Sequence, residues 1–129
     1  MKIGFVGCGN MATAIIKGII KKQIIEEENI MASAKTKTTL ERVQRELGIK
    51  VSMDNSEVVK NSDIVVLAVK PQYYQEVIEQ IKDTVSDNQI IISIAPGKTL
   101  AWLQDCFGKN VKLVRTMPNT PALVGEGMT

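Results

Sequence analysis

The sequence contains no histidine, and this absence removes several kinds of chemistry at once. Without histidine there can be no Ser–His–Asp triad and no imidazole acid or base. The two cysteines, Cys8 and Cys106, are far apart and have no partner spacing, so a zinc site of the usual Cys/His kind is excluded as well. We therefore expect no metal site and reduced thiols, and the sequence identifies no catalytic side chain.

The chain also lacks a strong charge of one sign and any long hydrophobic run. Its 16 basic and 14 acidic residues leave a formal net charge of +2, which is too small to predict binding to nucleic acid or to an anionic membrane. No stretch is long enough to span a bilayer. The apolar start is similar to a signal peptide, but Gly7, Gly9 and Asn10 interrupt it. We expect a cytoplasmic protein without a nucleic-acid or membrane partner.

What the sequence does contain is an alternation of short apolar runs and amphipathic helical stretches. The run at 64–69 is continuous and rich in β-branched residues, as in a central parallel strand that is buried on both faces. Strands are expected at 3–6, 30–32, around 51, 64–69, 90–94 and 111–114. Because helices separate them, we predict an α/β fold with a Rossmann-like, doubly wound parallel sheet in the order 3-2-1-4-5-6. A single domain is expected over 1–116, followed by a connecting segment at 117–129.

Polar residues beside the helical stretches predict where the helices begin and end. Thr38 and Glu41 have the spacing of a capping box, which would open a helix that Gly48 closes. Thr99 is expected to cap the last helix.

The first chemical motif is the segment Gly7-Cys8-Gly9-Asn10-Met11-Ala12, which has the form G-x-G-x-x-A. It directly follows a predicted strand and opens a predicted helix, the context that a dinucleotide-binding turn requires. Gly7 allows the tight turn, Gly9 lets a pyrophosphate approach the backbone, and Ala12 allows close packing of helix and strand. The free N–H groups of the helix start would face the phosphates. The alternative is that this turn has a structural role and binds no ligand. Within the turn, Cys8 would be open to oxidation if the start of the helix lowered the pKa of its thiol.

The end of the second predicted strand indicates which nicotinamide cofactor is bound. An NAD-preferring domain usually carries an acidic residue there, whereas this chain has Ser33-Ala34-Lys35-Thr36-Lys37. A hydroxyl and lysines suit a 2′-phosphate, so NADP(H) is favoured and NAD(H) remains possible. The alternative is that Lys35 and Lys37 are only solvated surface residues.

Three further segments follow strands at the edge where open α/β sheets bind ligands. They are Ala68-Val69-Lys70-Pro71, Ala95-Pro96-Gly97 and the polar stretch 115–121. Backbone of the first would line the ribose or nicotinamide, and Pro71 can start the next helix. Lys70 could equally well solvate the rim, Ala95-Pro96-Gly97 could be a plain turn, and 115–121 could be a linker.

Taken together, these residues resemble pyrroline-5-carboxylate reductase. The matching pieces are Gly4 to Ala12, Met31-Ala32-Ser33, Leu67 to Pro71 and Met117-Pro118-Asn119-Thr120-Pro121, and they cover the chain in order. The last two pieces are the most specific, since many Rossmann enzymes share the first. Ala12 stands where many members have glycine, and Pro96 stands where a small residue is common.

The resemblance implies NAD(P)H-dependent reduction of 1-pyrroline-5-carboxylate to L-proline, in proline biosynthesis. It implies that Val6 to Met11 hold the pyrophosphate, Ser33 and Lys35 the 2′-phosphate, and that Asn55 approaches the adenosine. The implied cofactor-binding residues are Val6, Gly7, Cys8, Gly9, Asn10, Met11, Ser33, Lys35, Asn55, Ala68, Val69, Lys70, Pro71, Ile94, Ala95 and Pro96. Asn119 and Thr120 would border the substrate. Hydride would move to an electrophilic imine carbon, which agrees with the absence of an acid–base pair.

Members of that family have a second, helical domain that makes the dimer and most substrate contacts. We therefore expect a homo-oligomer through that C-terminal domain in the full-length protein, and poor or no turnover by this chain alone. The alternatives are another NADP-dependent oxidoreductase, of the hydroxyacid dehydrogenase or F420-linked type, and a noncatalytic nucleotide-sensing module.

Overall fold

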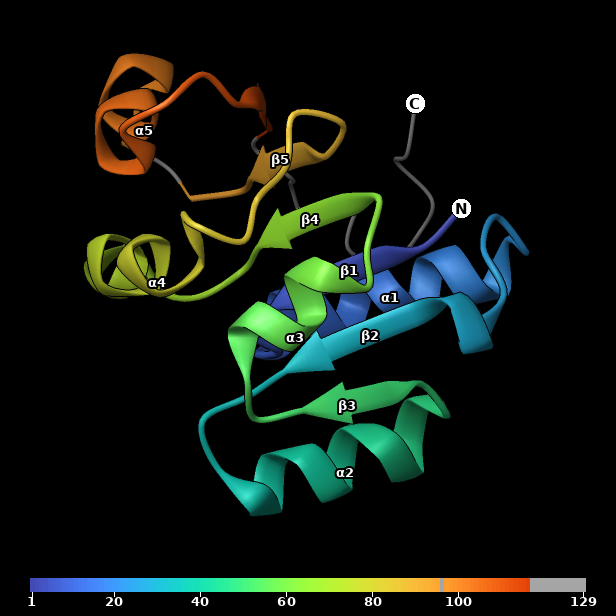
Figure 1. Cartoon of the computed structure of the whole chain (residues 1–129). Helices are drawn as coiled ribbons and strands as arrows, with labels where there is room; N and C mark the ends of the chain where they lie inside the picture. The colour runs from blue at the N-terminus through green and yellow to red at the C-terminus, as the bar shows by residue number, and fades with distance from the viewer. Residues whose placement is uncertain (96, 117–129) are drawn as a thin grey trace.

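A parallel β-sheet with helices on both faces forms the framework of the chain in a computed structural model that describes residues 1–95 and 97–116 (Figure 1). The strands are β1 (Ile3–Val6), β2 (Ile30–Ser33), β3 (Lys50–Ser52), β4 (Ile64–Leu67), β5 (Ile90–Ser93) and β6 (Lys112–Arg115). The α-helices are α1 (Asn10–Lys21), α2 (Lys37–Leu47), α3 (Asn55–Lys60), α4 (Tyr74–Ile81) and α5 (Leu100–Phe107), and the 3-10 helices are η1 (Glu27–Asn29) and η2 (Pro71–Tyr73).

The strand order is β3-β2-β1-β4-β5-β6, and every pair is parallel. This confirms the predicted doubly wound sheet. The chain moves outward from β1 in one direction as far as β3 and then returns to place β4 on the other side of β1. The crevice at the carboxyl ends of β1 and β4 is therefore the topological switch point, where such sheets bind ligands.

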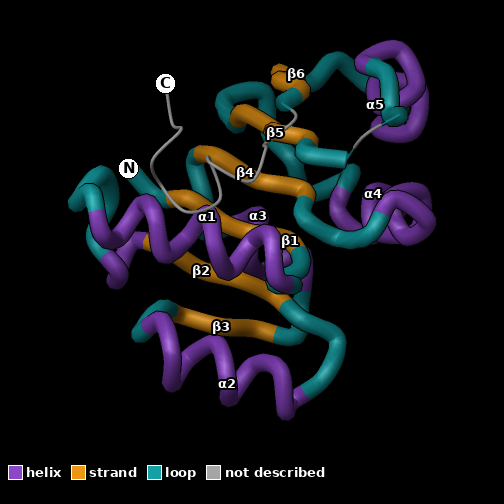
Figure 2. The backbone as a smooth tube through the Cα atoms, turned by 180° about the vertical axis from the view of Figure 1, so that it is seen from behind, coloured by secondary structure: helices purple, strands orange, loops and turns teal. Residues whose placement is uncertain are grey.

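The helices divide between the two faces of the sheet (Figure 2). Helices α1 and α2 cover one face, where Ile3 and Phe5 of β1 join Ile16 and Val43 in one apolar cluster. Helices α3, α4 and α5 cover the other face, where Val6 joins a second cluster. Alternate side chains of β1 thus point to opposite faces, and burial on both sides explains why the central strands β1, β4 and β5 are almost continuously apolar.

Glycine inside β1 allows α3 to lie unusually close to the sheet. A Cβ atom at Gly4 would overlap Ser62 Oγ and would lie 2.6 Å from Val58 Cγ1. The sequence predicts a strand at Gly4 but not this close contact with α3. A glycine inside a strand is nevertheless a signal that another segment packs closely against the strand.

The structure corrects one predicted helix start. Thr36, not Thr38, is the N-cap of α2, and its Oγ1 accepts a hydrogen bond from the N–H of Thr39 at 3.2 Å. The helix already includes Lys37 and Thr38, so the capping-box spacing was misleading. Gly48 closes α2 with a φ of 69°, and Thr99 caps α5 by accepting from the N–H of Trp102, both as predicted. None of the described helices is long and apolar enough to cross a membrane.

Candidate cofactor site

The predicted site residues meet at the carboxyl edge of the sheet because parallel strands all end there. The glycine turn follows β1, Ser33 ends β2, Ala68 to Pro71 follow β4, and Ile94 and Ala95 follow β5. The N–H of Ala68 donates to the carbonyl of Val6 at 2.9 Å, which ties the two sides of the switch point together. The predicted residues Pro96, Asn119 and Thr120 lie outside the described residues.

The two glycines of the turn have different reasons to be glycine. Gly7 has a φ of +92°, and a Cβ there would lie 2.7 Å from Val69 Cγ1, so the protein itself requires glycine. Gly9 has an extended backbone (φ −87°) and open space where a Cβ would stand. Neither backbone strain nor a described protein neighbour requires glycine at this second position. Glycine is a favoured N-cap residue, and a ligand that approaches the backbone closely is a further physical reason, which fits a pyrophosphate.

Helix α1 begins beside that open position. Gly9 is its N-cap and offers no side-chain hydrogen bond to the first N–H groups, and both Gly9 and Asn10 are exposed. Uncapped N–H groups and the positive end of the helix dipole together favour an anion. The helix has 12 residues, which is long enough for the dipole to develop, and Ala12 is buried against the sheet as predicted.

Cys8 contributes only its backbone to this edge, because its side chain points inward. It is buried in the cluster beneath α1, with Sγ 3.7 Å from Thr13 Oγ1. Burial raises the pKa of the Cys8 thiol, and the hydrogen bond to Thr13 offsets this only in part. The condition for easy oxidation, a pKa lowered by the helix, is therefore not met.

Ser33 is buried, with 1% of its surface exposed, and its hydroxyl is already engaged. The N–H of Gly7 donates to Ser33 Oγ at 3.0 Å, and the hydroxyl donates to Asn55 Oδ1 at 2.5 Å. Ser33 thus fixes the glycine turn to the start of α3. Contact between Ser33 and a 2′-phosphate stays a prediction, and it would need the hydroxyl hydrogen that Asn55 accepts here.

The same hydrogen-bond chain continues to α4. Asn55 Nδ2 donates to Gln80 Oε1 at 2.7 Å, and Ser56 Oγ donates to the carbonyl of Gln80 at 3.2 Å. Gln80 therefore sets which way the Asn55 amide faces. Sequence reasoning missed Gln80, since no local motif connects two residues that are 25 positions apart.

Lys35 is exposed in the loop after β2, with its Nζ 3.6 Å from the centroid of the Tyr73 ring. Because β2 and β4 flank β1, the loops that carry Lys35 and Tyr73 lie on either side of the glycine turn. A cation that has no carboxylate partner among the described residues is thus held at the edge where a phosphate is expected. Tyr73 was not among the predicted site residues, and a lone aromatic residue after a strand gives no distinct signal.

A second tyrosine holds the carboxyl ends of β4 and β5. Tyr74 is buried, and its hydroxyl donates to the carbonyl of Leu67 at 2.7 Å and lies 3.1 Å from Ser93 Oγ. Burial raises the pKa of the Tyr74 hydroxyl, and the hydrogen bond to Ser93 offsets this only in part. Pro71 starts η2 as predicted, while Lys70 and Pro71 are exposed at the rim.

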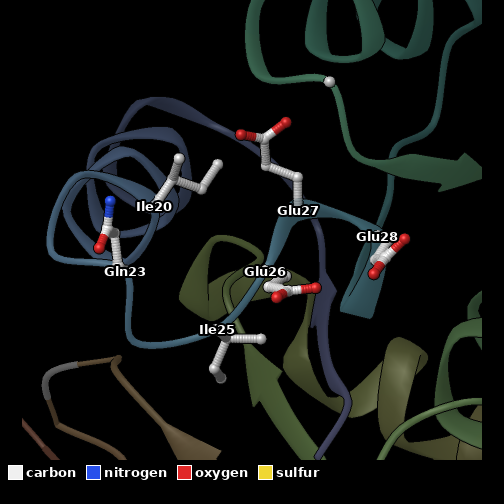
Figure 3. Close-up of a pocket in the computed structure, with 7 residues that line it drawn as sticks. Ile20, Gln23, Ile25, Glu26, Glu27 and Glu28 are labelled. Carbon is white, nitrogen blue, oxygen red and sulfur yellow. The ribbon is translucent and has the colours of Figure 1, made fainter.

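A different hollow, of about 720 Å³, lies at the amino edge of the sheet and does not suit the same ligand (Figure 3). It lies beside the end of α1 and is lined by Ile20, Gln23, Ile25, Glu26, Glu27, Glu28 and Gly48. Hydrogen bonding and charge repulsion from Glu28 raise the pKa of Glu26. Three neighbouring carboxylates would repel a pyrophosphate, so the carboxyl edge is the candidate cofactor site.

Comparison with known families agrees with a nucleotide-binding domain. Residues 2–97 match the family described as "NADP oxidoreductase coenzyme F420-dependent". The match includes the glycine turn, Ser33, Lys35, Asn55 and the segment after β4.

Individual relatives are more specific. Over 125 residues the chain is 42% identical to a pyrroline-5-carboxylate reductase of Methanosarcina acetivorans, covering 97% of this chain and 46% of the relative. Among solved structures, a pyrroline-5-carboxylate reductase from Coxiella burnetii has a TM-score of 0.89 at 35% identity, over 95% of this chain and 46% of that one. A Plasmodium falciparum pyrroline carboxylate reductase with NADP bound has a TM-score of 0.85 at 34% identity, over 97% and 45%. The chain spans about half the length of the relatives it matches.

Proposed function

The chain belongs to the family of coenzyme F420-dependent NADP oxidoreductases, and from this premise we propose that it is the cofactor-binding part of a pyrroline-5-carboxylate reductase. The observation that carries the proposal is the open, unstrained Gly9 in front of the uncapped start of α1, at the β1/β4 switch point. The similarity to reductases that use this substrate supports the choice of reaction.

In this proposal the chain binds NADP(H) and orients it. Val6 to Met11 receive the pyrophosphate, Ser33 with the help of Lys35 meets the 2′-phosphate, and Asn55 faces the adenosine. Ala68 to Pro71 and Ile94 to Pro96 border the ribose and nicotinamide. The bound cofactor supplies a hydride, and the protein's contribution is position rather than proton transfer.

The remaining parts of the proposal concern the whole protein. Residues 1–116 form the cofactor-binding unit, 117–129 lead toward a helical domain, and Asn119 and Thr120 border 1-pyrroline-5-carboxylate. The full-length protein forms a homo-oligomer through that domain and acts in the cytoplasm. The greater length of the relatives supports a second domain.

Titration of the chain with NADPH and with NADH by calorimetry, at moderate and fixed salt, tests cofactor binding. We expect saturable binding of both, with NADPH tighter. Lys35→Ala should weaken NADPH binding by about three- to tenfold and leave NADH unchanged, because it removes one charge-assisted contact to the 2′-phosphate.

The matched control is Lys37→Ala, which removes an exposed lysine in the first turn of α2. An equal loss of NADPH affinity in both variants would mean that Lys35 acts only through its charge at long range and makes no specific contact with the 2′-phosphate. Failure of the parent chain to bind either cofactor would contradict the proposed cofactor site.

The reaction itself is tested on the protein that contains this chain together with its C-terminal part. Consumption of NADPH should depend on 1-pyrroline-5-carboxylate and should yield proline. The family description also covers F420-linked enzymes, so the same assay with reduced F420 and with 2-hydroxy acids is the necessary comparison. Cofactor binding without turnover of any of these would favour a nucleotide-sensing module.

A further inference from the structure

We propose that Tyr73 determines cofactor specificity by holding the Lys35 ammonium where a 2′-phosphate binds. Tyr73 would act as a positioning residue, without touching the cofactor itself. This inference rests on the proposed function and adds a residue that selects NADP(H) over NAD(H).

The geometry brings together two loops that are separate in sequence. Lys35 comes from the loop after β2, and Tyr73 is the last residue of η2, after β4. Their contact of 3.6 Å, from Nζ to the ring centroid, is well within the distance at which a cation is attracted to the ring face. The ammonium is thereby held at the carboxyl edge, beside the turn where the pyrophosphate is expected.

The ring is itself fixed, so it can position a flexible partner. Tyr73 is partly buried and packs against the apolar cluster beneath α4, next to the buried Tyr74. Its N–H donates to the carbonyl of Lys70 at 2.9 Å, and Pro71 restrains the start of the same turn. A free lysine side chain samples many rotamers, and a fixed ring face reduces this freedom before the cofactor arrives.

The ammonium also remains available to a phosphate. Within residues 1–95 and 97–116 the ion pairs are Arg42–Glu46 and Lys82–Glu79, so Lys35 has no carboxylate partner there. A lysine ammonium has three N–H donors, and contact with a ring face leaves donors directed away from the ring. The ring can therefore hold the cation while its other side binds an anion.

Binding of NADPH and of NADH to Tyr73→Leu and Tyr73→Phe tests the inference in the 129-residue chain. Tyr73→Leu removes the ring and should weaken NADPH binding by about two- to fivefold, the effect of one exposed cation–π contact. NADH binding should not change, because NADH has no 2′-phosphate. Tyr73→Phe keeps the ring face and should retain most of the NADPH affinity.

A double-mutant cycle with Lys35→Ala shows whether Tyr73 acts through Lys35. In the Lys35→Ala background, Tyr73→Leu should have no further effect on NADPH binding. Thermal unfolding of each variant shows whether it is folded. If Tyr73→Leu is unfolded, Tyr73→Met, which keeps apolar bulk but has no ring, takes its place in the same titrations.

Three results would overturn the inference. Equal weakening of NADPH and NADH would mean that the ring stacks on the nucleotide or only supports the fold. Tighter NADPH binding by Tyr73→Leu would mean that the ring competes with the phosphate for Lys35. If the parent chain prefers NADPH and Tyr73→Leu binds NADPH equally well, the role of Tyr73 is refuted and the proposed function stands. If the parent chain binds neither cofactor, the proposed function is refuted as well.

Discussion

At the scale of single residues, the glycine turn separates what the fold needs from what a ligand needs. Gly7 is fixed by its positive φ and by Val69, whereas nothing in the described structure requires Gly9 to lack a side chain. The sequence motif predicts both glycines, yet only the structure distinguishes their roles.

Substitution by alanine should therefore mainly lower the stability of the fold at Gly7 and mainly weaken cofactor binding at Gly9. Gly7→Ala should lower the free energy of unfolding by about 1–3 kcal/mol, because alanine is strained at this φ and meets Val69. Gly9→Ala should lower stability by only about 0.5–1 kcal/mol, because alanine is a poorer N-cap than glycine, and should weaken cofactor binding at least about tenfold. Urea unfolding and calorimetric titration check the two results, and a stable Gly7→Ala variant would contradict the first.

Ser33 provides a second residue-scale prediction. Ser33→Ala leaves the N–H of Gly7 and Asn55 Oδ1 without their partner, which should cost about 1–2 kcal/mol of stability. Because the glycine turn is shared by both cofactors, both affinities should fall, and the predicted contact of Ser33 with the 2′-phosphate should make the loss larger for NADPH than for NADH. An equal loss for NADPH and NADH would contradict a contact between Ser33 and the 2′-phosphate. Ser52→Ala, at the end of the neighbouring strand β3, is the matched control.

Cys8 should be protected from thiol reagents in the folded chain. Burial favours the protonated thiol and raises its pKa above the ordinary value of 9.0. The folded chain is therefore most stable below pH 9.0 with respect to this group. It loses stability as the pH rises above 9.0, because the thiol ionises more easily in the unfolded chain. At pH 8 a disulfide reagent should modify the partly exposed Cys106 first and Cys8 only on unfolding. Mass spectrometry can monitor which cysteine is modified. Rapid modification of Cys8 in the native chain would contradict the predicted protection.

At the scale of elements, the strands and the helix faces follow from periodicity, but the helix starts depend on how the chain leaves the sheet. Thr36 and Thr38 both suit an N-cap by residue type. The backbone of Thr36 is extended and its Oγ1 reaches the N–H of Thr39, whereas Thr38 lies within the first turn of α2. A local pattern cannot tell these positions apart.

Paired alanine substitutions test the cap. Thr36→Ala should lower stability by about 1 kcal/mol, since it removes the side-chain acceptor at the start of α2. Thr38→Ala should have almost no effect, because Thr38 is exposed and alanine favours a helix. The free energy of unfolding is measured in urea for both variants. Equal losses would contradict the assignment of Thr36 as the N-cap and would favour the capping box at Thr38.

At the scale of the whole molecule, the sheet brings residues from five loops to one edge. The Gly7–Ser33–Asn55–Gln80 hydrogen-bond chain connects four of the elements around the cofactor site. Binding at this edge should therefore stabilise the entire domain rather than one loop.

Thermal or urea unfolding with added cofactor checks this coupling. At a free NADPH concentration of one hundred times its dissociation constant, the free energy of unfolding should rise by about 2.7 kcal/mol. NADH at the same concentration should give a smaller rise, as its affinity is expected to be lower. The absence of any shift with NADPH would contradict binding to the native state.

The sequence by itself determined the doubly wound sheet, its strand order and the place of the glycine turn. These follow from local signals: apolar runs, helical spacing and the glycines that a tight turn needs. The partners of Ser33, the inward direction of Cys8 and the contact between Lys35 and Tyr73 were decided only by the tertiary structure. Each joins residues that are distant in sequence and depends on which strands are neighbours and how closely the helices pack, and no local pattern encodes these distances.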